Sequence, residues 1–372
     1  MVALRKTVEG ESDGGGRRTR LEDVAAAVGL SSASVSLVLR NAPGPSAQTR
    51  VRVLDAAERL GYRPDRAASL LARRRSRLIG VVMEVRSSFH AELVEDLYDV
   101  AERCGYDLVL STRTRTRDER RAVDTLLDSR CEALVLLGPE TPSNRLAALD
   151  RQLPVVAVGR RFPSAGLDVV RVADDEGVGQ AVGHLVELGH RSIVYVDGGT
   201  GTIATDRRRG YRRAMRSRRL AGDIRVISAD HTEKAGSRAA RLLLEAGELP
   251  TAVVTFNDRS AVGLLDTFSR AGVDVPGRIS VVGYDDSPLS RLAHVNLTTV
   301  SQDTRGLIEH VVAAVVERLD EGRTEHHEVI LAPRLVVRGT TAPPGDEWRP
   351  ATVPSVGRAA VRRTRRRGRP HQ

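Results

Sequence analysis

Residues 32–39 combine small, uncharged side chains with an apolar stripe on one short predicted helix. Val35, Val38 and Leu39 recur at the spacing of a helix face that packs inward. The positions that point elsewhere are Ser32, Ala33, Ser36 and Leu37. Side chains of this kind let a helix lie deep in the major groove of DNA, which is ~12 Å wide. The pattern predicts a base-reading helix, and the alternative is an ordinary surface helix.

Two more predicted helices position this one. Residues 21–28 carry apolar side chains three and four apart, Thr19 and Glu22 have the spacing of a capping box, and Gly29 supplies a tight turn. Ser31 is placed to cap the second helix. A third helix is predicted over 46–60, and its apolar side comprises Val51, Leu54, Ala57 and Leu60. These elements form a helix-turn-helix headpiece.

The composition excludes several protein classes. The chain has 372 residues, 41% of them hydrophobic, which is enough for at least two globular cores. Cys104 and Cys131 form neither a disulfide framework nor a metal-ligand set. The first residues are polar and glycine-rich, and no run of about 18 apolar residues follows. We therefore expect a cytoplasmic protein without metal or membrane span.

Positive charge is concentrated at the two ends of the chain, whose net charge is +10. Residues 1–77 hold 15 Lys or Arg and 8 Asp or Glu, and residues 341–372 hold 8 Arg and 2 Asp or Glu. A general preference for arginine explains the residue type but not this segregation. A basic module that binds phosphate groups, joined to a near-neutral body, explains both the arginine content and its concentration at the ends.

From residue 78 onward, apolar strands alternate with amphipathic helices. Strands are predicted at 78–83, 107–110, 133–137, 155–158, 192–196, 226–228, 252–255 and 279–283. Helices are predicted at 91–104, 118–128, 177–188, 206–217, 232–246, 260–271 and 304–320. Continuous apolar strands are typical of parallel sheets covered by helices on both faces. The pattern predicts two Rossmann-like lobes with a ligand cleft at the carboxyl ends of the strands.

The body carries no sequence signature of an enzyme. No Gly-x-Gly-x-x-Gly follows a predicted strand, no phosphate loop is present, and the histidines form no HExxH pair. His326 and His327 lie in a polar linker and are expected in a solvated turn. An exported sugar-binding protein would need an export signal and would have no use for a headpiece. We expect no catalytic residues and no cofactor.

Ordered motifs run through the headpiece and the body. In the headpiece they are Asp23-Val-Ala, Gly29-Leu-Ser, Ser34-Val-Ser and Leu60-Gly-Tyr62-Arg-Pro64. In the body they are Leu188-Gly-His190, Arg207 with Gly210-Tyr211, Phe256-Asn257-Asp258, Gly283-Tyr284-Asp285-Asp286 and Leu297-Thr-Thr-Val300. Over residues 19–341 the chain resembles the LacI/GalR family of bacterial transcription regulators. The resemblance implies an all-α headpiece and an α/β effector domain of two periplasmic-binding-protein-like lobes.

Composition and resemblance together divide the chain into five segments. They are a disordered arm (1–18), the headpiece (19–62), a hinge helix and linker (63–77), a two-lobed effector-binding and dimerisation domain (78–340) and a basic disordered tail (341–372). The N-lobe is expected at about 78–172 and 301–322, and the C-lobe at about 173–300 and 323–340.

The resemblance also implies how DNA is bound. Base-reading positions are matched by Ser32, Ala33, Ser36 and Leu37, and phosphate contacts are expected from Arg20, Ser31, Ser34 and Arg40. Leu71, with Ala68 before it, matches a hinge leucine inserted into the minor groove. Many relatives carry arginine where this chain has Leu37, and leucine suits a thymine methyl better than a guanine edge. Two subunits would read a near-palindromic operator.

Phe89, Arg207, Asn257 and Asp285 match positions that line the effector cleft in relatives. An aromatic ring, an arginine fork, an amide and a carboxylate suit a polyhydroxylated ligand, so a sugar is the expected effector class. Two features of the cleft depart from the family: Gly159 replaces a frequent acidic residue, and Ser87-Ser88-Phe89-His90 replaces a more usual Asn-Pro-Phe-Phe.

These inferences predict a homodimeric repressor whose operator binding is controlled by a small molecule. The departures at Gly159 and in residues 87–90 leave open a regulator that has lost effector binding. A sugar-binding protein without a regulatory role is the less favoured alternative.

Overall fold

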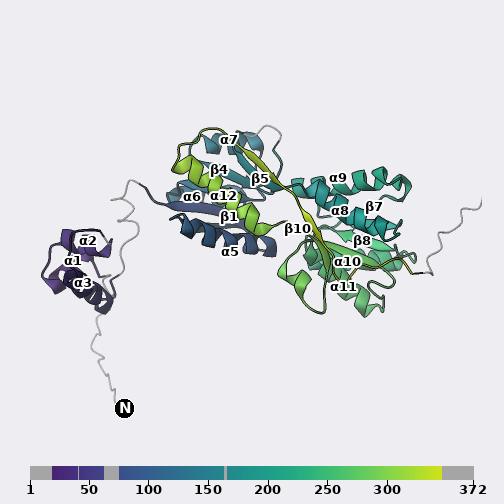
Figure 1. The fold of residues 1–372 in the computed structure, drawn as a ribbon, viewed down its shortest axis with the longest axis horizontal. Coiled ribbons are helices and arrows are strands. Elements are labelled where there is room, and N and C mark those ends of the chain that lie inside the picture. The colour runs from purple at the N-terminus through teal and green to yellow at the C-terminus, as the bar shows by residue number, and fades with distance from the viewer. Residues whose placement is uncertain (1–18, 41, 63–74, 163–165, 346–372) are drawn as a thin grey trace, which may run out of the picture. The chain divides into compact units, whose positions relative to one another are not determined.

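The computed structural model describes residues 19–40, 42–62, 75–162 and 166–345, and the chain divides into two compact units, 1–76 and 77–372 (Figure 1). The predicted arm, the hinge residues Ala68 and Leu71, and the tail beyond residue 345 lie outside the described residues.

The first unit contains three short helices, α1 (Leu21–Val28), α2 (Ser32–Leu39) and α3 (Ala47–Arg59). Gly29 ends α1 with a φ of 67°, a left-handed conformation that suits glycine, and the chain bends by 104° between α1 and α2. One core joins the three helices and comprises Val24, Ala25, Val28, Val35, Val38, Val53, Ala56 and Ala57. The predicted helix-turn-helix is confirmed.

The predicted capping box of α1 is wrong by one residue. Arg20 is the N-cap, and its backbone N–H donates to the Asp23 carboxylate at 2.7 Å. Thr19 instead donates through Oγ1 to the carbonyl oxygen of Leu60 at 2.8 Å. The threonine therefore ties the start of α1 to the end of α3.

The predicted apolar side of α3 is wrong at three of its four positions, Val51, Leu54 and Leu60, and right at Ala57. Val51 and Leu54 are 58% and 52% exposed, whereas Val53, Ala56 and Ala57 are buried. The small alanine side chains let α3 approach the other two helices closely. The larger residues Val51, Leu54 and Leu60 also recur at helical spacing, and this second stripe favoured the wrong face.

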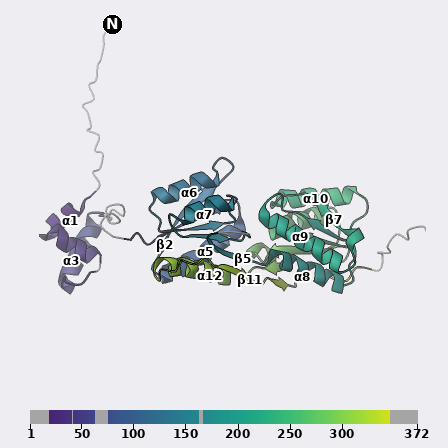
Figure 2. The same ribbon diagram turned by 90° about the horizontal axis from the view of Figure 1, so that it is seen from above.

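The first lobe of the second unit is a parallel sheet in the order β11-β5-β4-β3-β1-β2. Its strands are β1 (Leu78–Glu84), β2 (Asp107–Arg113), β3 (Ala133–Leu137), β4 (Val155–Val158), β5 (Asp168–Val172) and β11 (Glu328–Leu331). Helices α5 (Ser88–Arg103) and α12 (Thr304–Leu319) pack on one face, and α6 (Glu119–Asp128) and α7 (Ser143–Asp150) pack on the other (Figure 2). Burial on both faces explains the unbroken apolar run of β3.

The second lobe repeats this plan, with the strand order β12-β10-β9-β8-β6-β7. Its strands are β6 (Ile193–Val196), β7 (Arg225–Ile227), β8 (Ala252–Thr255), β9 (Ser280–Asp285), β10 (Thr298–Ser301) and the antiparallel β12 (Arg334–Val336). Helices α8 (Asp174–Glu187) and α9 (Thr202–Ser217) cover one face, and α10 (Glu233–Glu245) and α11 (Asp258–Arg270) cover the other. Two 3-10 turns, η1 (Ala221–Asp223) and η2 (Pro288–Arg291), complete it.

The chain passes between the lobes three times, after β5, after β10 and after β11. The predicted return to the C-lobe at residue 323 is wrong, because β11 pairs in parallel with β5 of the N-lobe. Ion pairs hold this segment there: Arg323 contacts Asp168 at 2.9 Å, and Glu328 contacts Arg171 at 2.6 Å. The polar run before β11 is therefore anchored to the N-lobe and is not a boundary.

Candidate functional site

The exposed side of α2 carries the predicted base-reading residues. Val35 and Val38 are buried against α1 and α3. Ala33 is exposed, and three neighbouring positions are partly exposed: Ser32, Ser36 and Leu37. The face presents hydroxyl and methyl groups without a cationic side chain. Such a face can contact base edges through short polar groups and thymine methyls.

The predicted phosphate contacts fall into two groups. The Ser31 hydroxyl caps α2 by accepting from the backbone N–H of Ser34 at 3.2 Å, and the two hydroxyls lie 2.9 Å apart. Arg20 and Arg40 are exposed, and Arg40 keeps one donor on the Ser36 carbonyl at 3.2 Å. The serines therefore shape the helix start, and the arginines are the charged groups available at the ends of α1 and α2.

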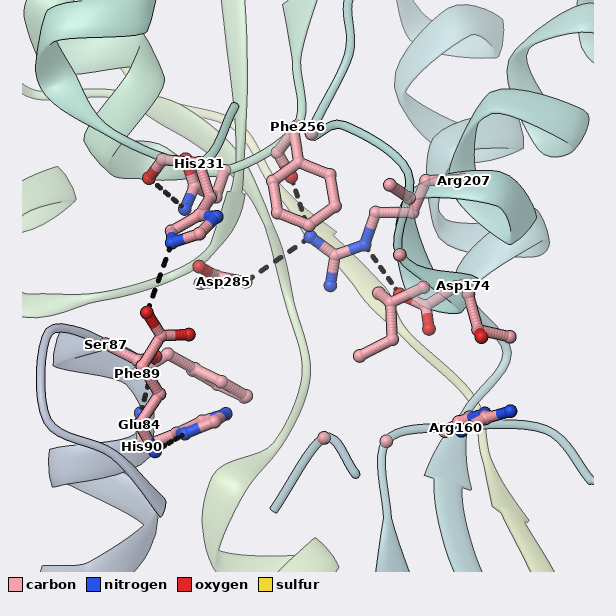
Figure 3. A pocket seen from close by; sticks show the side chains of 18 of the residues that line it. Glu84, Ser87, Phe89, His90, Arg160, Asp174, Arg207, His231, Phe256 and Asp285 are labelled. Carbon is pink, nitrogen blue, oxygen red and sulfur yellow. Dashed lines mark hydrogen bonds and ion pairs between the residues drawn. The ribbon is translucent and has the colours of Figure 1, made fainter. Parts of the chain in front are cut away.

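A cavity of about 630 Å³ lies between the lobes of the second unit (Figure 3). Its lining includes all four predicted effector residues: Phe89, Arg207, Asn257 and Asp285. Phe89 comes from the first turn of α5 in the N-lobe, and the other three come from the C-lobe. Sequence positions up to 196 residues apart thus meet at the carboxyl ends of the strands.

Arg207 is held in this cleft by hydrogen bonds, an ion pair and two aromatic rings. Its Nε donates to Asp174 at 2.7 Å, and its Nη1 donates to the Phe256 carbonyl at 2.6 Å. Its guanidinium also lies over the rings of Phe256 and Tyr284, 4.7 and 3.5 Å from their centroids. Although burial opposes charge, Asp174 raises the pKa of Arg207 above its ordinary value. The guanidinium is a fixed, permanently charged donor group.

Asp285 lies beside this arginine, with Oδ1 3.6 Å from Nη1 of Arg207. The same oxygen accepts a hydrogen bond from Gln302 at 2.8 Å. Its backbone has a φ of 118°, a conformation that residues other than glycine rarely adopt and that is concentrated at functional sites. Burial raises the pKa of Asp285 well above its ordinary value, against the effect of Arg207.

Both ends of the Asn257 side-chain amide form hydrogen bonds within the protein. Its Oδ1 caps α11 by accepting from the Ser260 N–H at 3.0 Å, and its Nδ2 donates to the His231 carbonyl at 3.1 Å. Asn257 therefore organises the wall of the cleft, and only donor or acceptor capacity beyond these bonds remains for a ligand.

His90 supplies a polar group next to Phe89 on the N-lobe side. Its Nδ1 accepts from the backbone N–H of Glu84 at 3.0 Å, which leaves the ring proton on Nε2. Burial, reinforced by the charge of Arg113, lowers the pKa of His90 to about 4. The histidine that replaces the family phenylalanine is thus a neutral donor, and Figure 3 shows its ring pointing into the cleft.

The departure at Gly159 has a backbone explanation. Its φ is 81°, which strains any other residue, and an added Cβ would lie 3.6 Å from Cδ1 of Ile203 in the C-lobe. The backbone would therefore strain an acidic residue at this position, although its Cβ would make only an ordinary van der Waals contact with the opposite lobe. Glycine instead adds no side chain to this wall of the cleft.

The polar cleft residues that the sequence did not predict include Glu84, Asp174, His231 and Gln302. Glu84 ends β1 and Asp174 begins α8 directly after β5, so both occupy strand ends where ligands bind in such folds. Their position at the ends of strands could have identified them from the sequence. His231 and Gln302 lie in connecting segments without a local motif.

Within the described parts of the chain, no three His, Cys, Asp or Glu side chains are grouped to hold a metal ion. No single described helix is long and apolar enough to cross a membrane, although α1 and α2 together, bent by 104°, match in length and composition.

The chain matches two protein families. Residues 20–65 match the bacterial regulatory proteins of the lacI family, and residues 182–341 match the periplasmic binding protein-like domain. The HTH-type transcriptional regulator GalR of Escherichia coli (strain K12) is 31% identical over 332 residues, which cover 88% of this chain and 97% of GalR.

Solved structures show the same architecture. A LacI transcriptional regulator from a Rhodococcus species is 43% identical, with a TM-score of 0.69 over 72% of this chain and 99% of that one. The lac repressor dimer bound to operator and the anti-inducer ONPF is 27% identical, with a TM-score of 0.76 over 88% of this chain and 100% of that one. The CelR–cellobiose complex is 27% identical, with a TM-score of 0.63 over 87% and 100%. The chain therefore belongs to the lacI family of bacterial regulatory proteins.

Proposed function

We propose that this chain is a homodimeric repressor that reads a near-palindromic operator through α2. A small carbohydrate controls it by lowering or raising its affinity for the operator. As a lacI-family member it is a DNA-binding transcription regulator and not an enzyme. The observation that carries the proposal is the cleft, in which Arg207 is locked beside Asp285 opposite an aromatic residue of the other lobe.

The DNA-binding part of the proposal assigns different roles to the two groups of headpiece residues. Ser32, Ala33, Ser36 and Leu37 read base edges, and phosphates are contacted by Arg20, Arg40, Ser31 and Ser34. The small face of α2 supports the first assignment, and the exposed arginines support the second. Leu71, with Ala68, acts as the minor-groove wedge of the hinge.

A neutral polyhydroxylated ligand fits the charges of the cleft. Arg207 is paired with Asp174, Arg113 with Glu119, and Arg259 with Glu233, so these cations are already neutralised. Arg160 also lines the cleft, and among the described residues its Nη1 donates to the carbonyls of Pro139 and Thr141 and to no carboxylate. Hydroxyl groups can bind the paired charges as both donors and acceptors, whereas a phosphate at Arg207, Arg113 or Arg259 would have to displace a carboxylate. CelR, a relative with the same fold, is described in complex with cellobiose.

Dimerisation follows from the DNA-binding mode. One headpiece contacts a half-site, and specific affinity for a palindrome requires two headpieces related by a two-fold axis. The lac repressor, which resembles this chain, is described as a dimer bound to operator. We infer that the chain acts in the cytoplasm, where operator DNA is found.

A regulator without an effector is the second candidate. Asn257 supports it, because both ends of its amide already bond within the protein. The volume of the cleft, about 630 Å³, favours the effector-binding function.

Selection of bound duplexes from a random DNA pool tests the operator proposal. We expect a near-palindromic consensus and a dimer by sedimentation, and a monomer that selects an asymmetric site would contradict it. Adding cellobiose, glucose or galactose separately to the complex then tests the effector proposal. A change in operator affinity with one sugar supports it, and no change across these and a wider sugar panel supports the second candidate.

A further inference from the structure

Two polar contacts join the lobes beside the cleft, in addition to the three segments where the chain crosses. One pairs Glu84 at the end of β1 with His231 before α10, and the other joins Arg259 of α11 to the Arg86 carbonyl. Each contact has one partner in each lobe, so a change in lobe separation must change both. We call these four residues the clasp.

The contact between Glu84 and His231 is loose as it stands. Oε1 of Glu84 lies 3.7 Å from Nε2 of His231, and this buried nitrogen has no hydrogen-bond partner among the described residues. Contact with His231 lowers the pKa of Glu84 to about 2, so the carboxylate remains ionised. A further approach of the lobes by about 1 Å would bring the pair to hydrogen-bond distance.

The second contact is set by a prearranged arginine. Arg259 binds Glu233 through two parallel hydrogen bonds, Nε to Oε1 at 2.7 Å and Nη2 to Oε2 at 2.6 Å. This fork leaves Nη1 to donate across the cleft to the carbonyl oxygen of Arg86. Because the fork fixes the guanidinium in its own lobe, the bond to Arg86 responds directly to lobe position.

The clasp is built onto the residues that we assign to the effector. Asn257 caps the helix that carries Arg259 and also holds the backbone of His231. On the other side, the backbone N–H of Glu84 is held by His90. Glu84 and His231 also line a second, polar cavity of about 680 Å³, so this pair lies where the two cavities meet.

We propose that Glu84, Arg86, His231 and Arg259 hold the lobes at their resting separation and thereby position the two walls of the effector site. The inference rests on the proposed effector-binding role of the cleft. An effector that needs the closed lobes binds with an apparent affinity reduced by the fraction of molecules that are open. The clasp therefore sets effector affinity through the population of closed molecules.

Distances between spin labels in the ligand-free full-length protein test the proposal. Labels are placed on exposed positions of opposite lobes, Arg145→Cys and Arg212→Cys, in a Cys104→Ser background that keeps the buried Cys131. Labelled subunits are diluted with unlabelled ones, so that distances within one subunit dominate. We expect Glu84→Gln and Arg259→Gln each to shift the interlobe distance distribution to longer values and to broaden it.

The matched control is Arg270→Gln, which removes an exposed ion pair with Asp266 on the same helix as Arg259 but within one lobe. Its distribution should equal that of the parent. Exchanging the charges, Glu84→His with His231→Glu, should restore the parental distribution. Unchanged distributions in both clasp variants, with a native circular dichroism spectrum, would overturn the proposal. Because the measurement uses neither DNA nor sugar, a failed sugar screen would contradict the effector proposal and leave the clasp standing.

Discussion

The guanidinium carbon of Arg207 lies 3.5 Å from the centroid of the Tyr284 ring, with both side chains buried. Tyr284 belongs to β9, next to Asp285, and Arg207 belongs to α9. The aromatic face stabilises the cation, which is largely withdrawn from water at the wall of the cleft. Arg207 is therefore both a core residue of the C-lobe and a wall of the cleft.

Removing Arg207 alone should destabilise the protein strongly. Arg207→Met leaves Asp174 buried without its partner, which costs about 3–5 kcal/mol of unfolding free energy. The double variant Arg207→Met with Asp174→Leu removes that stranded charge and should recover part of the loss, because the buried Asp285, 3.6 Å from Arg207, still loses its cation. Urea unfolding of the second unit measures both. Equal losses in the single and the double variant would contradict the pairing argument.

Close approach of α10 and α11 should make two glycines intolerant of alanine. A Cβ on Gly263 would lie 1.9 Å from the Glu233 carbonyl oxygen, and one on Gly236 would lie 1.9 Å from that of Ser260. Each Gly→Ala variant should lose at least about 1–3 kcal/mol, because the contacted atoms are backbone and cannot move aside. Thermal unfolding checks this loss.

Gly179 in α8 provides the control for that measurement. Apart from its chain neighbours and the backbone of its own helix, no described atom lies within 4 Å of the position that its Cβ would take, so Gly179→Ala should stabilise the helix by about 0.5–1 kcal/mol. Stability should thus fall in the Gly236→Ala and Gly263→Ala variants and rise in Gly179→Ala. This difference separates steric exclusion from a general sensitivity to substitution. A destabilised Gly179→Ala would count against the explanation.

Glu92 should make stability depend on pH. Its Oε1 is buried without a hydrogen-bond partner among the described residues, and burial raises the pKa of Glu92 from 4.5 to about 7. The folded state therefore holds this proton more tightly than the unfolded chain. Its contribution to stability is complete below about pH 4.5 and is lost as the pH rises towards 7.

Substitution of Glu92 by glutamine isolates this contribution. The difference in unfolding free energy between Glu92→Gln and the parent should grow in favour of the variant from pH 4.5 to 7 and then level off. Urea titrations at several pH values measure it. A constant difference across the range would show that the carboxyl group does not titrate there.

Leu37→Arg should change the preferred operator. An arginine at this position can form two hydrogen bonds with guanine, so selection should replace a T·A pair by a G·C pair at two symmetric positions, with a discrimination of about 1–3 kcal/mol. Leu54→Ala, on an exposed part of α3, should keep the parental consensus. An unchanged consensus for Leu37→Arg would remove Leu37 from the base-reading set.

Much of the fold follows from local patterns. The strand predicted at 133–137 matches β3, and the helix predicted at 304–320 matches α12 to within one residue, because continuous burial and amphipathic spacing are local properties. β5 lacked such a signal, since it buries Asp168 and Arg171. These charges are tolerated because residues about 150 positions later, including Arg318 and Glu328, pair with them. No local window contains that information.

The candidate site likewise contains residues that local sequence patterns identify and residues that only long-range contacts identify. The four effector residues taken from motif matches all line one cleft. Phe89, Asn257 and Asp285 mark the start of a helix or the end of a strand, and Arg207 lies in the second turn of α9. Gln302 and His231 have no such marker. Their importance arises from contacts across the cleft and next to Asp285, which depend on how the lobes pack.

The three crossings between the lobes mean that neither lobe corresponds to one continuous stretch of the gene. The sheet that begins with β1 lacks α12 and its edge strand until residue 331 has been synthesised. On the ribosome, the lobe that is started first is therefore completed almost last, with Leu307, Ile308 and Val311 filling its core. A premature stop codon near residue 303 would thus leave an open hydrophobic face on the older half of the protein, and the fragment should be degraded rather than act as a shortened regulator.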